Sequence, residues 1–380
     1  MNKVTLIATA TFGLEMVVRH ELQALGFAIT KGAEGRIEFE ATMEDIPKAN
    51  LWLRSADRLL LKMGEFEALS FDELFEKTKA LPWEDLITVD GKFTVNGKAV
   101  KSKLGSIRAC QAIVKKAVVE RLKEIYKVEW FDETGPEYTI QIAMHNDVAL
   151  LTVDTSGPGL HKRGYREKWG DAPLKETLAA ALVLLSFWDR DRILIDPMCG
   201  SGTILIEAAM IARNMAPGLL RQFASERWPA IDSEAWSRER RAAREAFNTE
   251  GRLKIFGYDI DESCISASRL NARNAGVEND IIFEQKDIKD LWIDKQYGII
   301  ISNPPYGKRM SDFKEINEIN ISIHKTFKKK KGWSVFILTA DELFPDYFKR
   351  AAPDRVRKLF NGKIKVNYYQ YHGEKPPDKP

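Results

Sequence analysis

Cysteine is scarce in this chain of 380 residues, and its three cysteines lie far apart. Cys110, Cys199 and Cys264 are odd in number and do not follow the spacing of a disulfide framework or of a zinc site. The five histidines do not lie at metal-ligand spacing from a cysteine or from one another either. The sequence therefore predicts a protein of a reducing compartment that binds no metal.

Long apolar runs are absent as well. No segment is long and apolar enough to span a bilayer, and the N-terminus does not have the apolar core of a signal peptide. The net charge of +3 is too small to indicate a nucleic-acid partner by itself, although the charges are unevenly distributed along the chain. We expect a cytoplasmic globular protein of two or three domains that does not contact a membrane.

The most informative string that is present is Asn303-Pro-Pro-Tyr306, directly after the apolar run Gly298–Ile301. Pro304 and Pro305 cannot continue a central strand, because proline has no backbone N–H group. The side-chain carbonyl of Asn303 and the backbone carbonyl of Pro304 could hold a planar amino group by its two N–H bonds. The ring of Tyr306 could stack on a base. The string predicts a site for a nucleophilic amine, and its simpler interpretation is a loop after a strand.

A glycine-rich turn lies upstream of this string. The apolar run Arg192–Ile195 precedes Asp196-Pro-Met-Cys-Gly-Ser-Gly-Thr203, and a helical segment, Ile204–Arg213, follows. Glycines let a backbone turn tightly and approach a ligand, and the N–H groups of a helix start point at that ligand. The turn has no lysine after its last glycine, as a P-loop requires, and Leu205 stands where the dinucleotide fingerprint needs a glycine. The turn therefore favours a nucleoside with an amino-acid tail over a pyrophosphate.

Acidic residues follow the next two predicted strands. Asp259 follows Lys254–Tyr258, where a carboxylate can accept hydrogen bonds from both hydroxyls of a ribose. Asp287 follows Ile281–Glu284, where a carboxylate can bind the exocyclic amine of an adenine. A single acidic residue after a strand is more often a turn former or a helix cap. All of these strand ends together, in this order, indicate a nucleoside cofactor beside an amine acceptor.

With these motifs, residues 172–380 resemble a class I S-adenosylmethionine-dependent methyltransferase of the amino-methylating branch. The resemblance implies an α/β fold with a Rossmann-like, seven-stranded, mostly parallel sheet that ends in a hairpin of Val356–Phe360 and Lys365–Tyr371. It implies S-adenosylmethionine as the cofactor. The implied catalytic residues are Asn303, Pro304, Pro305 and Tyr306. The implied cofactor-binding residues are Lys175, Thr177, Asp196, Pro197, Cys199, Gly200, Ser201, Gly202, Thr203, Asp259, Ile260, Asp287 and Ile288.

The first half of the chain has shorter elements. Strand and helix patterns alternate over Val4–Ala10, Leu14–Leu25, Arg36–Glu40 and Glu44–Leu53, which predicts a small ferredoxin-like α+β unit.

The stretch Gly97–Lys127 carries nine Lys and Arg residues against two Glu, mostly on the predicted helix Ser106–Ile125. One interpretation is a solvated helix face, and the other is a surface that binds RNA phosphates. Together with Phe93-Thr-Val-Asn-Gly-Lys98 and Ser102-Lys-Leu104, the stretch resembles the THUMP domain of RNA-modifying enzymes. This resemblance implies an RNA partner.

Basic residues surround Tyr165 in the glycine-containing segment Ser156–Arg166. This segment is either a solvated linker or a strand that touches nucleic acid. With the following Ala172–Leu182, it resembles a bacterial family of ribosomal-RNA guanine-N2 methyltransferases, in a form with a single methyltransferase domain. The predicted RNA-binding residues are Lys101, Lys103, Arg108, Lys115, Lys116, Lys162, Arg163 and Arg166.

We expect a ferredoxin-like unit at 1–60, a THUMP domain at 61–155, a basic linker at 156–171, the methyltransferase domain at 172–372 and a flexible tail at 373–380. The favoured activity is methylation of a guanine N2 amine in RNA, with 23S ribosomal RNA preferred to tRNA as the substrate. Adenine N6 and the side chain of a protein glutamine stay open as acceptors, because the acceptor string suits each of them. A non-catalytic RNA-binding factor of ribosome assembly is the rival from another class. The sequence does not determine the methylated nucleotide or the oligomeric state.

Overall fold

The computed structural model describes residues 3–167, 174–305, 312–328, 330, 332–348 and 352–374, without the side chains of 312–316. The described strands form two seven-stranded sheets. The chain divides into two compact units, which we describe separately. The first unit contains the residues up to Ala10, Val18–Leu160 and Gln222–Ala242, and the second contains Thr11–Val17, His161–Arg221 and the chain from Ala243 onward. No helix in the described part of the chain is both long and apolar enough to cross a membrane.

The sheet of the first unit is continuous from end to end. Its strand order is β2-β3-β1-β4-β7-β6-β5, and every neighbouring pair is antiparallel except β5 and β6. The strands are β1 (Lys3–Thr9), β2 (Ala28–Ala33), β3 (Arg36–Thr42), β4 (Arg58–Glu67), β5 (Lys92–Val100), β6 (Glu137–His145) and β7 (Val148–Asp154). The helices of this part of the chain are α1 (Glu15–Ala24), α2 (Ile46–Trp52), α3 (Phe71–Lys79) and α4 (Ile107–Tyr126). Because β4 pairs with both β1 and β7, the ferredoxin-like and THUMP regions share one sheet.

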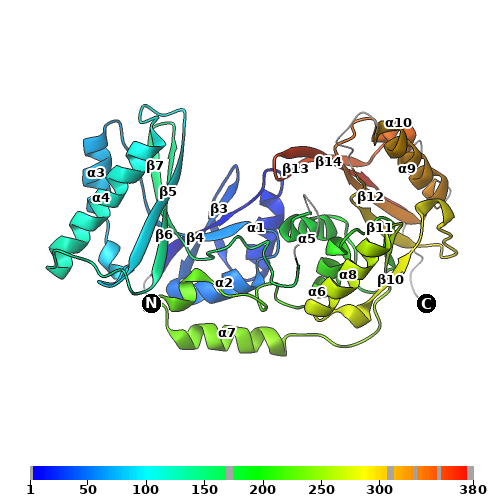
Figure 1. Cartoon of the computed structure of the whole chain (residues 1–380), viewed down its shortest axis with the longest axis horizontal. Coiled ribbons are helices and arrows are strands. Elements are labelled where there is room, and N and C mark those ends of the chain that lie inside the picture. The colour runs from blue at the N-terminus through cyan, green and yellow to red at the C-terminus, as the bar shows by residue number, and fades with distance from the viewer. Residues whose placement is uncertain are drawn as a thin grey trace. The chain divides into compact units, whose positions relative to one another are not determined.

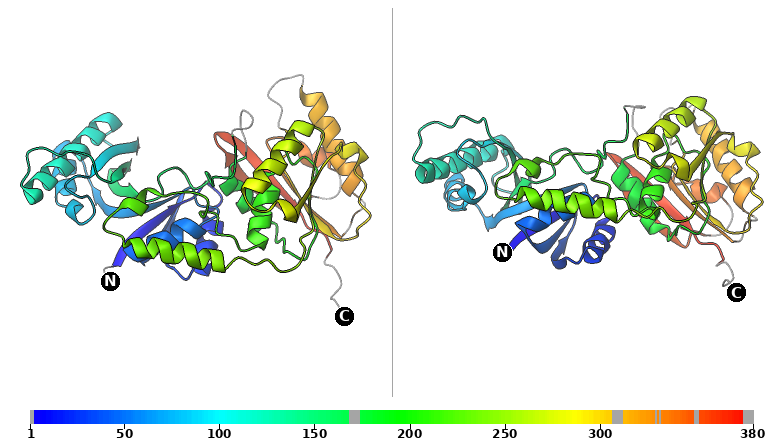
Figure 2. Two further views of the ribbon diagram at one scale, coloured as in Figure 1. Left: turned by 60° about the horizontal axis from the view of Figure 1, so that its bottom comes forward. Right: turned by 90° about the horizontal axis from the view of Figure 1, so that it is seen from below.

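Helix α4 lies beside α3 in every view of the molecule (Figures 1 and 2). It begins at the Ser106 cap, whose hydroxyl accepts a hydrogen bond from the Ala109 N–H at 3.4 Å. A stripe of residues spaced by four is buried: Cys110, Val114, Val118 and Leu122. This helical period leaves the opposite face of α4 in solvent, and most of its basic residues lie there.

The second sheet has the order β10-β9-β8-β11-β12-β14-β13. The first five of these strands run parallel, β14 is antiparallel to β12, and β13 is antiparallel to β14. The strands are β8 (Leu194–Asp196), β9 (Ile255–Asp259), β10 (Ile281–Gln285), β11 (Gly298–Ser302), β12 (Trp333–Thr339), β13 (Arg355–Asn361) and β14 (Ile364–Tyr371). The seven-stranded, mostly parallel sheet that the sequence predicts is confirmed.

Helices cover both faces of the second sheet (Figure 1). The helices of the second unit are α5 (Glu176–Leu185), α6 (Thr203–Ala212), α8 (Glu262–Asn274), α9 (Asp312–Phe327) and α10 (Phe344–Tyr347). The remaining helix, α7 (Ser233–Glu245), belongs mostly to the first unit. One apolar core contains residues of α5, α6 and α8, and a second core contains residues of α9 and α10. Every residue of β12 is buried, as expected for a strand covered on both faces.

The segment Gln222–Ala242 belongs to the first unit, although it lies in sequence between α6 and β9. The indole of Trp228 stacks on the ring of Tyr138, with the ring centroids 5.1 Å apart. Its N–H group donates to the backbone carbonyl of Glu137 at 3.1 Å. Trp228 is fully buried, so it anchors this segment on β6.

The sequence patterns did not predict β2 or α9. Strand β2 has only partly buried and exposed residues, so it lacks the apolar alternation that marks a strand.

Candidate active site

The parallel strands β10, β9, β8 and β11 end at one edge of the second sheet. The register pairs Asp196 at the end of β8 with Gly257, and Asp259 at the end of β9 with Gln285. The strand order reverses between β8 and β11, since β9 and β10 lie on one side of β8 and β11 and β12 on the other. A crevice for ligands forms where the strand order reverses, outside the carboxyl ends of the strands. The predicted site residues that follow these strands therefore lie together.

The turn between β8 and α6 depends on two glycines with left-handed backbone. Gly200 has a φ of +51°, and a Cβ atom added there would meet no atom within 4 Å. Gly202 has a φ of +79°, and a Cβ atom there would come within 2.9 Å of Ser268. The turn is thus open in front of Gly200 and closely packed behind Gly202, so a ligand can approach its backbone.

Backbone hydrogen bonds connect this turn to β9. The Cys199 N–H donates to the Tyr258 carbonyl at 2.8 Å, and the Gly200 N–H donates to the Asp259 carboxylate at 2.9 Å. The second oxygen of that carboxylate accepts a bond of 3.0 Å from the Asp261 N–H. Asp259 therefore sets the position of the turn as well as offering acceptors at the strand end.

The remaining predicted cofactor residues occupy varied environments. Asp287 accepts a hydrogen bond of 2.9 Å from the Lys289 N–H and caps the short helix η5 (Ile288–Asp290), in which Ile288 is buried. Ile260 is 65% exposed beside Asp259. Lys175 is the N-cap of α5, and Thr177 is buried in its first turn. Pro197 and Ser201 lie in the turn, and Thr203 begins α6.

A hydrogen bond joins the turn to the acceptor string. The Ser302 hydroxyl, at the end of β11, donates to Oδ1 of Asp196 at 2.7 Å, and the Met198 N–H donates to the same oxygen at 3.1 Å. Asp196 and Ser302 are 2% and 0% exposed. Burial raises the pKa of Asp196 to about 7, the two donors oppose that rise, and the negative charge of Asp259 adds to it. The residue before Asn303 is therefore held directly against the glycine-rich turn.

The acceptor string itself is described only as far as Pro305. Asn303 is partly buried, Pro304 is buried and Pro305 is exposed. All three follow β11 at the carboxyl edge, as the sequence predicts. Tyr306 lies outside the described residues, so its role as a stacking platform stays a prediction.

Arg166 connects the starts of two helices at the site. Its guanidinium lies 3.0 Å from the Glu176 carboxylate in α5, donates to the Leu174 carbonyl at 2.8 Å, and donates to the Thr203 hydroxyl in α6 at 2.6 Å. Its side chain is 12% exposed. Arg166 thus holds the helix that follows the glycine-rich turn. The RNA contact that the sequence predicts for Arg166 stays a prediction.

Arg163 corrects a prediction from the sequence. Its side chain is 1% exposed and pairs with Glu207 of α6, with Nε and Oε1 3.4 Å apart. The Tyr165 hydroxyl donates to the same carboxylate oxygen at 3.1 Å. Arg163 was predicted to bind RNA phosphates, but that prediction is wrong because the guanidinium is buried in an ion pair. Lys162 beside it is exposed.

Helix α8 completes the contacts of the turn. The buried Asn271 side chain donates to the Ser201 carbonyl at 3.1 Å, and its oxygen accepts a bond of 3.4 Å from the Glu167 N–H. Asn274 donates to the Tyr165 carbonyl at 3.1 Å. Segment 163–167 is therefore fixed to α5, α6 and α8 around the turn.

The predicted RNA-binding residues of the first unit lie on its surface. Lys101, Lys103 and Arg108 are exposed before and within the start of α4. The Lys115 ammonium lies 5.9 Å from the centre of the Phe93 ring, and the Lys116 ammonium lies 5.7 Å from that of Phe75. Within the described residues these five side chains make no ion pair with a carboxylate, so their charge is available to an anionic partner.

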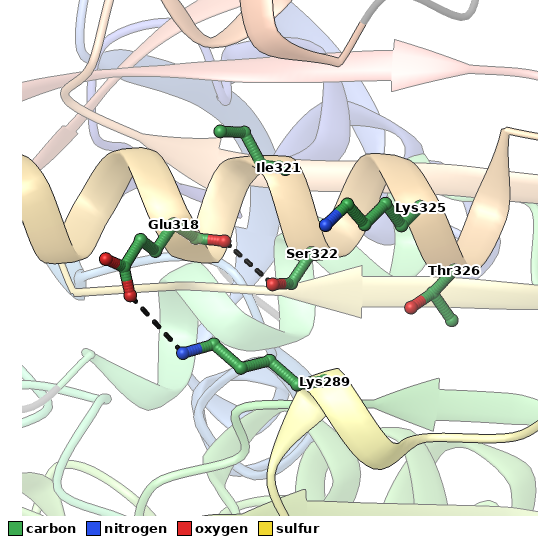
Figure 3. A pocket seen from close by; sticks show the side chains of 6 residues that line it. All are labelled: Lys289, Glu318, Ile321, Ser322, Lys325 and Thr326. Atoms are coloured by element: carbon green, nitrogen blue, oxygen red, sulfur yellow. Dashed lines mark hydrogen bonds and ion pairs between the residues drawn. The ribbon is translucent and has the colours of Figure 1, made fainter.

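A surface hollow of about 430 Å³ lies between η5 and α9 (Figure 3). Lys289 and Glu318 form an ion pair of 3.3 Å in it, and the Ser322 hydroxyl donates to the Glu318 carbonyl at 2.7 Å. Its other lining residues are Ile321, Lys325 and Thr326. None of the predicted site residues lines it, and we assign it no function.

Comparison with known proteins agrees with this geometry. The family model described as RMKL-like, methyltransferase domain, matches residues 163–370. The chain belongs to this family. Two further models match its first half, the RlmL ferredoxin-like domain at residues 5–60 and the THUMP domain at residues 68–154. The family resemblance and the fold class that the sequence predicts are confirmed.

Relatives of the family match the chain along its whole length. The Bacillus subtilis (strain 168) protein described as "Putative RNA methyltransferase YpsC" is 47% identical, over 100% of this chain and 98% of the relative. Ribosomal RNA large subunit methyltransferase K/L of Syntrophotalea carbinolica is 34% identical over 96% of this chain, which spans about half (53%) of that relative. The crystal structure of SMU.472 complexed with SAH is 43% identical, with a TM-score of 0.93, and the match covers 99% of this chain and 100% of that one.

The site contains further residues that the sequence motifs do not predict. Glu207 carried a visible signal, because it is a single acidic residue in the otherwise apolar helix TILIEAAMIA. Ser302 stands directly before the acceptor string, but nothing in the sequence shows that β8 lies beside β11. Asn271 has no sequence signal, since an Asn in an amphipathic helix is ordinary.

Replacing Asp196 by Asn should change how stability depends on pH. The pKa of about 7 in the folded protein lies above the ordinary 3.8, so folding favours the protonated carboxyl. That contribution is present below about pH 4 and is lost as the pH rises through about 7. A shift of about three pKa units corresponds to at most about 4 kcal/mol. As the pH rises from about 4 to about 7, denaturant titrations should show that the wild type loses more free energy of unfolding than the Asp196→Asn variant does.

The exposed Asp189 provides the matched control. Asp189→Asn should run parallel to the wild type over the same range. Both hydrogen bonds to Asp196 end on Oδ1, so an Asn can keep them. A constant difference between the wild type and Asp196→Asn across this range would contradict a raised pKa at Asp196.

Replacing Glu207 by Gln should destabilise the second unit by about 3–5 kcal/mol, because it removes the carboxylate charge from the buried ion pair with Arg163. Glu278→Gln is the control, since Glu278 pairs with Arg273 at 2.7 Å on the surface. The control should cost less than about 1 kcal/mol. Thermal and denaturant unfolding measure both changes. An equal loss in the free energy of unfolding for the two variants would show that the buried pair contributes no more to stability than the surface pair.

Proposed function

We propose that this methyltransferase transfers a methyl group from S-adenosylmethionine to the exocyclic N2 amine of a guanine in RNA, and that this RNA is 23S ribosomal RNA. The observation that carries the proposal is the Ser302–Asp196 hydrogen bond. It holds the acceptor string Asn303-Pro-Pro against the turn that binds the cofactor in proteins of this fold. A methyl donor and an amine acceptor are needed side by side, and these two elements meet at one edge of the sheet.

The residues of the turn suit S-adenosylmethionine. The open space before Gly200 admits a ligand to the backbone. The first N–H groups of a helix have no acceptor within the helix, so those of α6 suit a carboxylate. Asp259 offers carboxylate oxygens for a ribose, and Asp287 offers them for an adenine amine. When bound, the cofactor supplies an electrophilic methyl group on a sulfonium. A homologous structure contains its demethylated product, SAH.

The acceptor string addresses the main chemical difficulty of this reaction. An amine on an aromatic base is a weak nucleophile, because its lone pair is delocalised into the ring. Acceptors at Asn303 and Pro304 would bind its two N–H groups and stabilise the positive charge that grows on nitrogen. Fixed placement opposite the cofactor turn supplies the remaining advantage of orientation. These roles require no covalent intermediate.

Several features support RNA as the partner. The THUMP region carries exposed basic residues, Lys101 and Lys116 among them, that form no ion pair with a carboxylate in the described part of the chain. A target base must leave its stack to reach the site, which is easiest in the loops and single strands of structured RNA. The name of the Syntrophotalea carbinolica relative supports ribosomal RNA of the large subunit, although this chain spans about half of that protein. A ribosomal RNA substrate also fits the cytoplasmic location that the sequence analysis expects.

Replacing Asn303 by Ala should lower kcat by about 10²–10³, the usual effect of losing a preorganised acceptor at the reacting group. The affinities for S-adenosylmethionine and RNA should change much less. Turnover is measured by transfer of labelled methyl to ribosomal RNA and tRNA from a strain that lacks the protein. Undiminished turnover in the variant would exclude the proposed role of the string.

The modified nucleoside identifies the acceptor. Mass spectrometry after digestion should find N2-methylguanosine in 23S ribosomal RNA. N6-methyladenosine as the sole product would replace guanine by adenine, and product only in tRNA would replace the ribosomal substrate. Absence of methylated RNA in both pools, with S-adenosylmethionine bound, would overturn the RNA methyltransferase proposal in favour of a protein acceptor or a non-catalytic factor.

Removing charge from the THUMP surface should weaken RNA binding in a salt-dependent way. The variant Lys101→Gln, Lys116→Gln should reduce the slope of log affinity against log salt by about 1.4–1.8, since each lost phosphate contact removes about 0.7–0.9. Lys3→Gln, Lys92→Gln removes the same charge from lysines that pair with Glu40 and Glu137. The control should keep the wild-type slope, and identical slopes for both variants would place the RNA contact elsewhere.

A further inference from the structure

The hairpin of β13 and β14 extends beyond the edge of the sheet where the acceptor string lies. Strand β12 ends at Thr339, which pairs with Asn367 of β14, and Asn367 in turn pairs with Lys358 of β13. The hairpin continues past this point through three more residue pairs, as far as Asn361 and Ile364. At about 3.3 Å per residue, its tip reaches roughly 10 Å past the end of β12.

The tip stands on the acceptor side of the sheet. The strands follow the order β11, β12, β14 and β13, so β13 lies three strand spacings from β11. This separation amounts to about 14 Å. The cofactor turn follows β8 on the other side of β11. A base held at Asn303 would therefore have its neighbouring nucleotides within reach of the hairpin tip. The hairpin appears as the red strands in Figures 1 and 2.

Positive charge is concentrated on this hairpin. Between residues 355 and 365 every charged residue is basic. The basic residues are Arg355, Arg357, Lys358, Lys363 and Lys365. All are exposed except Arg357, which is partly buried. Within the described residues, their single ion pair joins Lys365 to Glu342 over 3.6 Å, and both partners are more than half exposed. Such a pair contributes little, so the charge of the hairpin is free to bind an anion.

Two aromatic rings lie at the same place. Phe360 pairs with Lys365 in the hairpin, and its ring meets that of Phe12 edge to face with the centroids 6.0 Å apart. Phe12 is 48% exposed. Gly13 follows the outer edge of β13 so closely that an added Cβ would lie 2.7 Å from the Lys358 carbonyl. An exposed ring next to several lysines is the combination that single-stranded nucleic acid binds by stacking and by phosphate contacts.

We propose that the tip of the β13–β14 hairpin, with Phe12 beside it, binds the RNA nucleotides that flank the target base. Lys363 and Lys365 contact phosphates, and Phe12 stacks on a base. This inference rests on the proposed function for the identity of the partner, and it adds a second RNA contact, on the acceptor side of the methyltransferase sheet. An acidic protein surface would suit the lysines, but it would not explain an exposed ring among them.

The test compares two double variants of the full chain that lose equal charge. Lys363→Gln, Lys365→Gln changes the hairpin tip. Lys254→Gln, Lys295→Gln changes exposed lysines that precede β9 and β11, at the opposite edge of the same sheet. The probe is an unmodified transcript of 23S ribosomal RNA, with binding measured from 50 to 200 mM salt. SAH binding by calorimetry checks that each variant is folded and keeps its cofactor site.

The hairpin variant should show a slope of log affinity against log salt that is shallower by about 1.4, the value for two phosphates of a single strand. The control variant should keep the wild-type slope. Phe12→Leu should weaken binding about fivefold with an unchanged slope, because a ring carries no charge. The KM for RNA should rise in the hairpin variant while kcat at saturating RNA stays constant.

Equal slopes in the hairpin and control variants would overturn the hairpin contact while leaving the proposed function intact. If the wild type bound the transcript and transferred no methyl group to it, the proposed reaction would fail, and the slopes would still decide the hairpin contact. A wild type that did not bind RNA at all would overturn both.

Discussion

The hydrogen bond from Ser302 to Asp196 is the contact on which the geometry of the site depends. It forms because β8 and β11 are parallel neighbours whose ends lie at one level of the sheet. Among the described residues no cation pairs with the buried carboxylate that accepts it, so its two hydrogen-bond donors reduce the cost of its burial. The same atoms therefore set the position of the glycine-rich turn and of the acceptor string. A methyl transfer requires both positions to be set together, since a small displacement of either removes the alignment.

Buried ion pairs restrict the geometry around this contact. The two arginines of segment 163–167 make contacts within the protein. Arg163 pairs with Glu207, and Arg166 binds Glu176 and Thr203. A buried ion pair is weak evidence for stability, because both charges lose their hydration. It does restrict the geometry, since each guanidinium must meet fixed partners. The segment therefore holds the starts of α5 and α6 in place.

The first unit combines a continuous sheet with the basic surface of the THUMP region. Its sheet joins β1, β4 and β7 without a break, so the ferredoxin-like region and the THUMP region form one body in this unit. The segment Gln222–Ala242 packs on that body through Trp228, although its flanking residues belong to the second unit. The two units are thus connected by more than one crossing of the chain. Under the two proposals above, the basic surface of the THUMP region and the basic hairpin each bind RNA phosphates.

The sequence by itself determined the family, the parallel sheet and the order of the strand-end motifs. Each of those motifs is local, because a short apolar run followed by glycine, proline or aspartate marks a strand end within one stretch of chain. Only the tertiary structure decided which strands become neighbours, and so only it showed that Ser302 meets Asp196 and that β4 joins β1 to β7. The burial of Arg163 could not be predicted, because an arginine in a basic segment looks like a surface residue until its partner, 44 positions away, is known. Periodicity reports which face of an element is apolar, and it carries no information about the side chain that another element brings opposite.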